Sequence, residues 1–180
     1  MSDADAGTGG PAAAPGGPES PRRTPGEDRR ANKRCLVLNG PNLQRLGTRQ
    51  PEIYGTATLA DIERMLVDAA PDGWTIDLRQ TDDEGTLLGW LHEAVDSRSP
   101  VILNPAAFTH YSYALRDAAV LVSEAGLPLI EVHLSNPHAR ETFRHTSVVS
   151  GVATGVIAGL GPDGYLLALR HLVTRATPAG

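Results

Sequence analysis

Short runs rich in apolar residues alternate with amphipathic stretches along the chain from Cys35 onward. Runs bounded by turn residues are typical of buried strands, and apolar spacings of three and four are typical of one face of a helix. Strands are therefore predicted at 35–38, 74–79, 101–103, 129–133 and 153–158. Helices are predicted at 58–69, from Asp83 onward, at 112–124 and at 162–173.

Strands that alternate with helices indicate repeated β-α units, in which neighbouring strands run parallel. A five-stranded parallel sheet with helices on both faces is a three-layer α/β sandwich, and the flavodoxin-like strand order 2-1-3-4-5 is the expected topology. Residues 1–32 lack this pattern. They are rich in Gly, Pro and Ala and are predicted to be a disordered tail. Residues 33–176 are predicted to form a single flavodoxin-like domain.

Net charge and cysteine content limit which binding partners and which cellular compartment are expected. The first 34 residues hold six basic and five acidic residues, and the rest of the chain holds 10 basic and 16 acidic ones, a net charge of −6. An acidic domain is a poor candidate for nucleic acid or an anionic membrane. Cys35 is the only cysteine, which is typical of a reducing compartment, so a cytoplasmic protein is expected. Neither a signal peptide nor a membrane-spanning run is recognised.

Polar side chains gather where the predicted strands end. The carboxyl ends of parallel strands share one edge of the sheet, so these side chains are expected to face one crevice. After the first strand, the loop over 39–55 also contains Arg45, Arg49 and Tyr54 and is predicted to be a mobile active-site segment that supplies a base. The polar residues at or after the strand ends are Asn39, Asn42, Asn104, His110, Glu131, His133, Ser135, Arg140 and Arg144.

Each of these residues also has a purely structural interpretation. An Asn at a strand end often caps a turn, His133 could be a hydrogen-bonded core residue, and the arginines could pair with acids such as Glu141. Tyr54 could be an ordinary loop aromatic. A crevice is favoured because five separate segments would otherwise have to place polar groups at one edge by coincidence.

Several classes of site are disfavoured. No Gly-rich dinucleotide fingerprint or P-loop follows a strand, so a nucleotide site is not expected. His110, His133 and His138 could join Glu131 around a metal, but they lack a spacing such as His-x-x-x-His, so no metal is predicted. The only lysine is Lys33, at the end of the tail. A Schiff-base mechanism, which needs a lysine in the crevice, is therefore not expected.

The chain resembles the type II 3-dehydroquinate dehydratases over nearly all of residues 35–173. The first and last of four matching blocks are the most specific, and the spacing between the blocks also agrees. The blocks are LNGPNLQRLGTRQPEIYG at 38–55, NPAAFTH at 104–110, IEVHLSN at 130–136, and HARE at 138–141 running on to FRH at 143–145.

The resemblance implies a cofactor-free loss of water from 3-dehydroquinate, giving 3-dehydroshikimate, in the shikimate pathway of aromatic amino acid biosynthesis. It implies Tyr54 as the base and Arg49 as the lid arginine beside it, where a guanidinium favours the phenolate. Asn42 would stabilise the enolate, and His133 would be the general acid, positioned by Glu131. The other matching positions are the substrate contacts Asn104, His110, Leu134, Ser135 and Arg144, the supporting Arg140, and Asp117, which in this family reaches a neighbouring subunit.

The family usually assembles as a dodecamer built from trimers, so a homo-oligomer is expected. Departures from its common pattern at 44–45, 80–82 and 111–113 remove none of the implied chemical groups. The resemblance does not distinguish aromatic biosynthesis from quinate degradation, since both use this reaction. Two alternatives remain open: a flavodoxin-like module that binds a small carboxylate or a flavin, and an oligomeric structural protein with a vestigial crevice.

Overall fold

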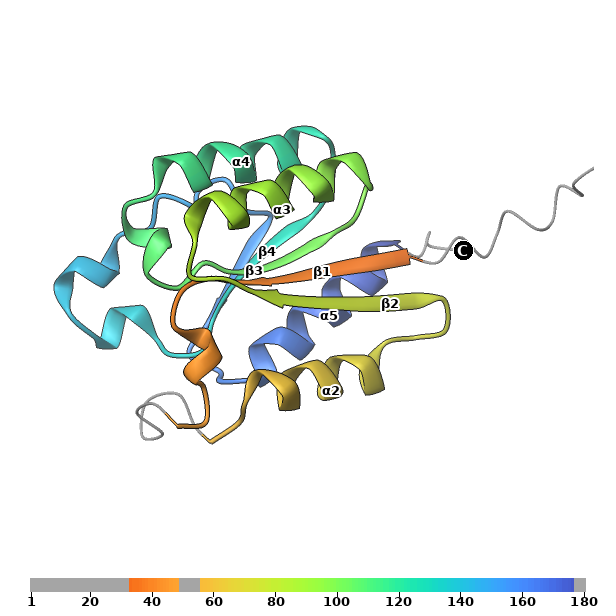
Figure 1. Cartoon of the computed structure of the whole chain (residues 1–180), viewed down its shortest axis with the longest axis horizontal. Coiled ribbons are helices and arrows are strands. Elements are labelled where there is room, and N and C mark those ends of the chain that lie inside the picture. The colour runs from red at the N-terminus through yellow and green to blue at the C-terminus, as the bar shows by residue number, and fades with distance from the viewer. Residues whose placement is uncertain (1–32, 49–55, 177–180) are drawn as a thin grey trace, which may run out of the picture. The chain divides into compact units, whose positions relative to one another are not determined.

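A computed structural model of the chain describes residues 33–48 and 56–176. Within these ranges the backbone forms a parallel sheet of five strands in the order β2-β1-β3-β4-β5 (Figure 1). The predicted flavodoxin-like strand order is therefore confirmed. The strands are β1 (Lys33–Asn39), β2 (Trp74–Gln80), β3 (Val101–Asn104), β4 (Leu129–His133) and β5 (Gly155–Ala158).

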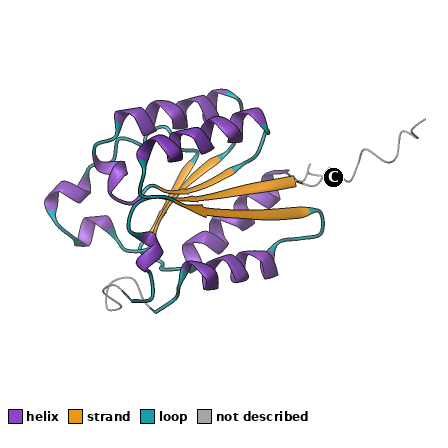
Figure 2. Cartoon of the chain, in the orientation of Figure 1, coloured by secondary structure: helices purple, strands orange, loops and turns teal. Residues whose placement is uncertain are grey.

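Helices cover both faces of the sheet. In Figure 2 the strands lie between two helical layers, and Figure 1 shows α3 and α4 on one face and α2 and α5 on the other. No helix of the described residues is long and apolar enough to cross a lipid bilayer. The α-helices are α2 (Leu59–Ala69), α3 (Glu84–Asp96), α4 (Tyr113–Glu124) and α5 (Asp163–Ala176). Short 3-10 helices are η2 (Leu43–Arg45), η3 (Ala106–His110), η4 (Pro137–Ala139) and η5 (Thr142–His145).

Successive side chains of the central strands point to opposite faces of the sheet, so the core is divided between those two faces. Leu36 and Leu38 of β1 pack in the cluster that includes α3 and α4, whereas Cys35 and Val37 pack in the cluster that includes α2 and α5. Successive side chains of a strand point to opposite faces, so a strand covered on both sides is apolar at every position. Burial raises the pKa of the Cys35 thiol to about 12, so this cysteine stays protonated and acts as a packing residue.

Side-chain caps set the starts of three helices. The Thr58 hydroxyl accepts a hydrogen bond from the N–H of Asp61, whose carboxylate accepts one from the N–H of Thr58. Asp83 and Ser112 cap α3 and α4, each by accepting from an N–H of the first turn. Such caps satisfy backbone donors that have no partner within the helix. The predicted helix starts at 58, 83 and 112 are therefore these three capping residues.

The main differences from the predicted elements lie in the first strand, the last strand and the segment 134–150. β1 begins at Lys33, because its polar first residues pair with β2 without contributing an apolar signal. The last strand begins at Gly155, because the N–H of Ala153 bonds to the carbonyl of Val149 in a turn. The segment 134–150, predicted to be irregular, contains η4 and η5. Hydrophobic periodicity detects none of these features, since each depends on backbone hydrogen bonds.

The carboxyl ends of β1 and β3 approach each other closely. The N–H of Gly40 donates to the carbonyl of Asn104 at 2.8 Å. A Cβ atom at position 40 would lie 2.6 Å from the carbonyl oxygen of Pro105, so only glycine fits there. This contact brings the loops that follow the two strands together at one edge of the sheet.

Candidate active site

A cleft lies at the carboxyl edge of the sheet, between the loops that follow β1, β3 and β4. Ligands bind at this edge in open parallel sheets, because the loops that leave the strands can converge there. The cleft therefore has the position expected from the sequence. The predicted site residues that line it are Asn42, Asn104, His110, His133, Leu134, Ser135, Arg140 and Arg144.

A larger hollow of about 1010 Å³ lies at the opposite, amino-terminal edge of the sheet, beside Lys33 and Trp74. Two of the cations that line it bond within the fold: Lys33 donates to the carbonyl of Ala176 at 2.9 Å, and Arg34 pairs with Glu93 at 2.8 Å. This hollow contains none of the predicted site residues. We therefore take the cleft at the carboxyl edge as the candidate active site.

His133, which lines this cleft, forms a hydrogen-bonded pair with the buried Glu131. They lie two residues apart on β4, hence on the same face of the strand, and His133 Nε2 is 2.8 Å from Glu131 Oε1. Glu131 is fully buried, whereas the His133 side chain keeps 12% of its exposure. Burial alone would raise the pKa of Glu131, but the hydrogen bond and charge of His133, with the Ser150 and Thr109 hydroxyls, hold this pKa below its ordinary value. Glu131 is therefore a carboxylate able to orient the ring.

His110, at the end of η3, contributes a second imidazole to the cleft. Its Nδ1 lies 2.8 Å from the carbonyl oxygen of Thr146, so Nδ1 carries the hydrogen. The pKa of His110 lies below its ordinary value, mainly because burial disfavours the charged ring. The hydrogen bond to the Thr146 carbonyl opposes this shift, and the positive charges of Arg144 and His133 add to it. A neutral ring bonded in this way can accept a ligand hydroxyl at Nε2.

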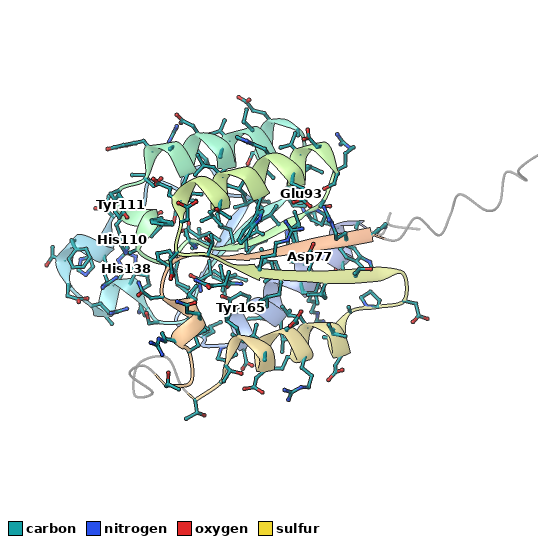
Figure 3. The ribbon with its side chains drawn as sticks, viewed as in Figure 1. Asp77, Glu93, His110, Tyr111, His138 and Tyr165 are labelled. Atoms are coloured by element: carbon teal, nitrogen blue, oxygen red, sulfur yellow. The ribbon has the colours of Figure 1, made fainter. Side chains whose placement is uncertain are left out.

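The histidines near this edge do not form a metal site. Figure 3 shows His138 on the same side of the molecule as His110, but the His138 ring packs against His145 with 5.5 Å between centroids. Within residues 33–48 and 56–176, no group of three or more His, Cys, Asp or Glu side chains is arranged to hold a metal ion. The only lysine of the chain, Lys33, starts β1 at the opposite edge.

A turn after β1 places Asn42 at the cleft in a left-handed backbone conformation with φ of 67°. Asn tolerates this conformation better than most residues other than glycine. Asp82 holds the turn, because its Oδ1 accepts from the Asn42 N–H at 2.7 Å and its Oδ2 accepts from Gln44 Nε2 at 2.9 Å. Gln44 and Asp82, both departures from the residues common in the resembled family, are thus in direct contact.

Beneath the cleft, Tyr165 of α5 joins the ends of β1 and β3. Its hydroxyl donates to Asn39 Oδ1 at 2.6 Å and accepts from Asn104 Nδ2 at 2.8 Å. The Asn39 amide also donates to backbone carbonyls of β1 and β2. Asn39 is therefore a fully buried structural residue, and the expectation that it faces the crevice is wrong. Asn104 does line the cleft, and its Oδ1 accepts from the N–H of Ala106.

Two arginines that follow β4 lie along one wall of the cleft. Arg144 pairs with Glu141 at 2.7 Å, and its guanidinium carbon lies 4.7 Å from the ring centroid of Phe143. Arg140 lies 3.5 Å from the same Glu141 carboxylate and donates to the Ser135 hydroxyl at 3.3 Å. Glu141 thus orients both cations, and this wall suits an anionic ligand.

One described residue among the predicted site residues, Asp117, is not brought into the cleft. Asp117 on α4 pairs with Arg116 at 3.0 Å, its side chain is 75% exposed, and it does not line the cleft. Arg49 and Tyr54 lie outside the described residues. The described chain therefore assembles the predicted acid, its carboxylate partner and the ligand-binding wall.

Sequence reasoning missed the hydroxyl groups around Glu131. Thr109 Oγ1 lies 2.5 Å from its carboxylate, and the Ser150 hydroxyl donates to the other oxygen. Thr109 lies within the NPAAFTH block but its partner is not evident from that motif, and no periodicity or motif marks Ser150. The one available signal is Glu131 itself, because a carboxylate within an apolar strand requires buried donors.

Known proteins match this chain over most of its described residues. The profile of the family described as dehydroquinase class II matches residues 33–173. A 3-dehydroquinate dehydratase from Salinispora tropica is 62% identical over 144 residues, which cover 79% of this chain and 99% of that protein. The 3-dehydroquinate dehydratase 2 from Pseudomonas aeruginosa is 53% identical over 141 residues, 78% of this chain and 93% of that protein.

Solved structures agree with this similarity. A type II dehydroquinase from Propionibacterium acnes has a TM-score of 0.74 to this chain at 53% identity. The match covers 79% of this chain and 97% of that chain. A type II dehydroquinase from Butyrivibrio crossotus also has a TM-score of 0.74, at 38% identity. The match covers 79% of this chain and 98% of that chain.

Proposed function

The chain belongs to the class II dehydroquinase family, and we propose that it dehydrates 3-dehydroquinate to 3-dehydroshikimate through an enolate, with Tyr54 as the base and His133 as the general acid. The observation that carries the proposal is the His133–Glu131 pair, held at 2.8 Å in a cleft that also presents Asn42 and Arg144. Relatives named for this activity support the reaction, and the cleft supports the roles of its residues.

The first step removes a proton from the carbon beside the substrate ketone. Such a proton is weakly acidic, so the base must be strong and yet present near neutral pH. Tyr54 suits this role, because a phenolate is a strong oxygen base and the Arg49 guanidinium favours the ionised phenol. An imine route would instead need a lysine in the cleft, whereas Lys33, the only one, is at the opposite edge of the sheet.

The second step expels the hydroxyl group that is β to the ketone. Negative charge on the enolate oxygen is stabilised by Asn42, directly or through water. As the enolate electrons form the carbon–carbon double bond, His133 protonates the departing oxygen and water leaves. Tyr54 gains one proton and His133 loses one, so the oxidation state does not change and no redox cofactor is consumed.

The substrate carboxylate needs fixed donors, and the loop after β4 supplies them. The Ser135 hydroxyl and the backbone N–H groups of 134–135 suit a carboxylate, with Arg144 adding positive charge to the same wall. His110 can accept a substrate hydroxyl at Nε2, because its Nδ1 is bonded to the carbonyl of Thr146. Asn104 forms part of the floor between these groups.

The direct test incubates the full-length chain with 3-dehydroquinate and follows the absorbance of the conjugated enone in the product. We expect turnover that neither a metal chelator nor borohydride added with substrate inhibits. No product, or loss of activity under either treatment, would contradict the proposal. A yellow preparation would instead favour a flavin-binding module.

Tyr54→Phe tests the base. Removing the phenolic hydroxyl should lower kcat by about 100-fold or more while binding of a substrate analogue survives. Tyr111→Phe is the matched control, because Tyr111 is 58% exposed on a different loop and should keep wild-type activity. Near-normal turnover in the Tyr54 variant would exclude it as the base.

We also propose that the enzyme assembles as a dodecamer built from trimers, acts in the cytoplasm and serves the shikimate pathway. Asp117 would then reach the cleft of a neighbouring subunit, a role that its 75% exposed side chain permits. Light scattering measures the subunit number, and a monomer in solution would contradict the assembly.

A further inference from the structure

Three hydroxyl groups surround the Glu131 carboxylate. Thr109 Oγ1 donates to Glu131 Oε1 at 2.5 Å, and Ser150 Oγ donates to Oε2. Ser147 Oγ lies 2.7 Å from Thr109 Oγ1 and 3.5 Å from Glu131 Oε1. The groups come from two separate segments, η3 and the loop between η5 and β5. The carboxylate is therefore enclosed by donors that β4 itself does not provide.

Backbone donors fix the direction of these hydrogen bonds. Ser147 Oγ accepts from the N–H of Val149 at 3.1 Å and from the N–H of Ser150 at 2.8 Å. A hydroxyl oxygen has two lone pairs, so both are occupied and the Ser147 hydrogen points to Thr109 Oγ1, the nearer of its two acceptors. Thr109 in turn donates to Glu131. The chain of donors thus runs one way, from the backbone to the carboxylate.

This arrangement determines the state of Glu131. Among the described residues, Thr109 donates to Oε1, Ser150 donates to Oε2, and His133 Nε2 lies 2.8 Å from Oε1. A hydrogen on either carboxyl oxygen would meet one of these donors, so the carboxylate is favoured. Because Oε1 also accepts from His133 Nε2, a neutral ring keeps its hydrogen on Nε2 and leaves Nδ1 bare.

We propose that Thr109, Ser147 and Ser150 are positioning residues that keep Glu131 ionised and oriented, so that His133 holds Nε2–H and exchanges its catalytic proton through Nδ1. The inference rests on the proposed function, since it takes His133 as the general acid. Without these hydroxyls the carboxylate can rotate or take the proton from Nε2. Less of the enzyme is then in the state that protonates the leaving group.

Thr109→Val removes the hydroxyl and keeps the shape of the side chain. We expect kcat for 3-dehydroquinate to fall about tenfold or more, with KM changed by less than about threefold. Thr109→Ser, which restores the donor, should recover most of the lost kcat. Ser123→Ala is the matched control, because Ser123 donates to the carbonyl of Val152 at 2.8 Å and ties down the same loop without touching Glu131. It should leave kcat unchanged.

Nitrogen-15 NMR of the histidine rings tests positioning without substrate. In the wild type, neutral His133 should show a protonated Nε2 and a bare Nδ1, whereas Thr109→Val and Ser150→Ala should give averaged shifts from mixed tautomers. Ser150→Ala repeats the test if Thr109→Val does not fold. An unchanged tautomer in the variants would overturn the inference, whatever their kcat. If the tautomer changes as expected but the wild type does not turn over 3-dehydroquinate, the proposed function fails and the positioning stands.

Discussion

At the scale of the residue, Tyr165 shows how one side chain can support two strand ends. It is fully buried, and burial raises its pKa well above the ordinary value, so the hydroxyl remains a donor. That hydroxyl donates to Asn39 and accepts from Asn104, which satisfies a buried oxygen on β1 and a buried amide on β3. The floor of the cleft thus depends on a residue of α5 that does not line it.

Tyr165→Phe should therefore destabilise the fold. Two buried polar groups would lose their partner, and each unsatisfied group costs about 1–3 kcal/mol. We expect the free energy of unfolding, measured with urea, to fall by at least about 1 kcal/mol. Tyr113→Phe, at a 70% exposed tyrosine of α4, is the control and should leave stability unchanged. Equal stability of the two variants would contradict this account.

At the scale of the element, the turn after β1 is held by the loop after β2. Asp82 accepts from the backbone of Asn42 and from the side chains of Gln44 and Gln80, so three donors fix the left-handed conformation at Asn42. The direction of the Asn42 side chain therefore depends on a neighbouring strand as much as on its own loop.

Asp82→Ala should loosen this turn. We expect kcat/KM for 3-dehydroquinate to fall about tenfold, since hydrogen bonds to a charged acceptor are lost, with little change in thermal stability. Asp82→Asn keeps an acceptor oxygen for the Asn42 N–H, so its kcat/KM should lie between those of the wild type and Asp82→Ala. The exposed Asp72, in the turn before β2, provides the control, and Asp72→Ala should behave as the wild type. A wild-type kcat/KM for Asp82→Ala would show that the turn at Asn42 keeps its conformation without Asp82.

The elements and the converging strand ends could be predicted, but the supporting contacts could not. Apolar strands and capping residues such as Asp83 and Ser112 act locally, so the sequence reveals them. The partners of Glu131 lie 22 and 19 residues away along the chain, at Thr109 and Ser150. The expectation that Asn39 faces the crevice is wrong for the same reason. Its partner Tyr165 lies on the last helix, and no local sequence pattern predicts that contact.

At the scale of the whole molecule, an ion-pair network ties two strands to a helix away from the cleft. Arg79 of β2 pairs with Asp77 and with Glu93 of α3, and Arg34 of β1 pairs with the same two acids. Figure 3 shows Asp77 and Glu93 on the other side of the molecule from His110. The hydrogen bond from Arg79 holds the pKa of Glu93 at about 2, against the opposing effect of burial and with further help from Arg34.

The lowered pKa predicts how stability depends on pH. A carboxylate whose folded pKa is depressed stabilises the fold above its unfolded pKa of about 4.5, and this contribution is lost as pH falls towards about 2. Glu93→Gln should reduce the free energy of unfolding at neutral pH by about 0.5–1 kcal/mol, because the pair is partly solvent-screened. Urea titrations should show this difference shrinking below pH 4.5. Glu63→Gln, at an exposed site on α2, is the control, and a pH-independent difference for Glu93→Gln would contradict the prediction.

The position of Lys33 has a practical consequence. An amine-reactive support can attach this chain only through Lys33 or the N-terminal amine, since the chain has no other lysine. Lys33 begins β1, so attachment there holds the protein by the amino-terminal edge of the sheet and leaves the cleft at the carboxyl edge open to solution. Coupling through Lys33 should therefore orient the protein with its cleft facing the solution.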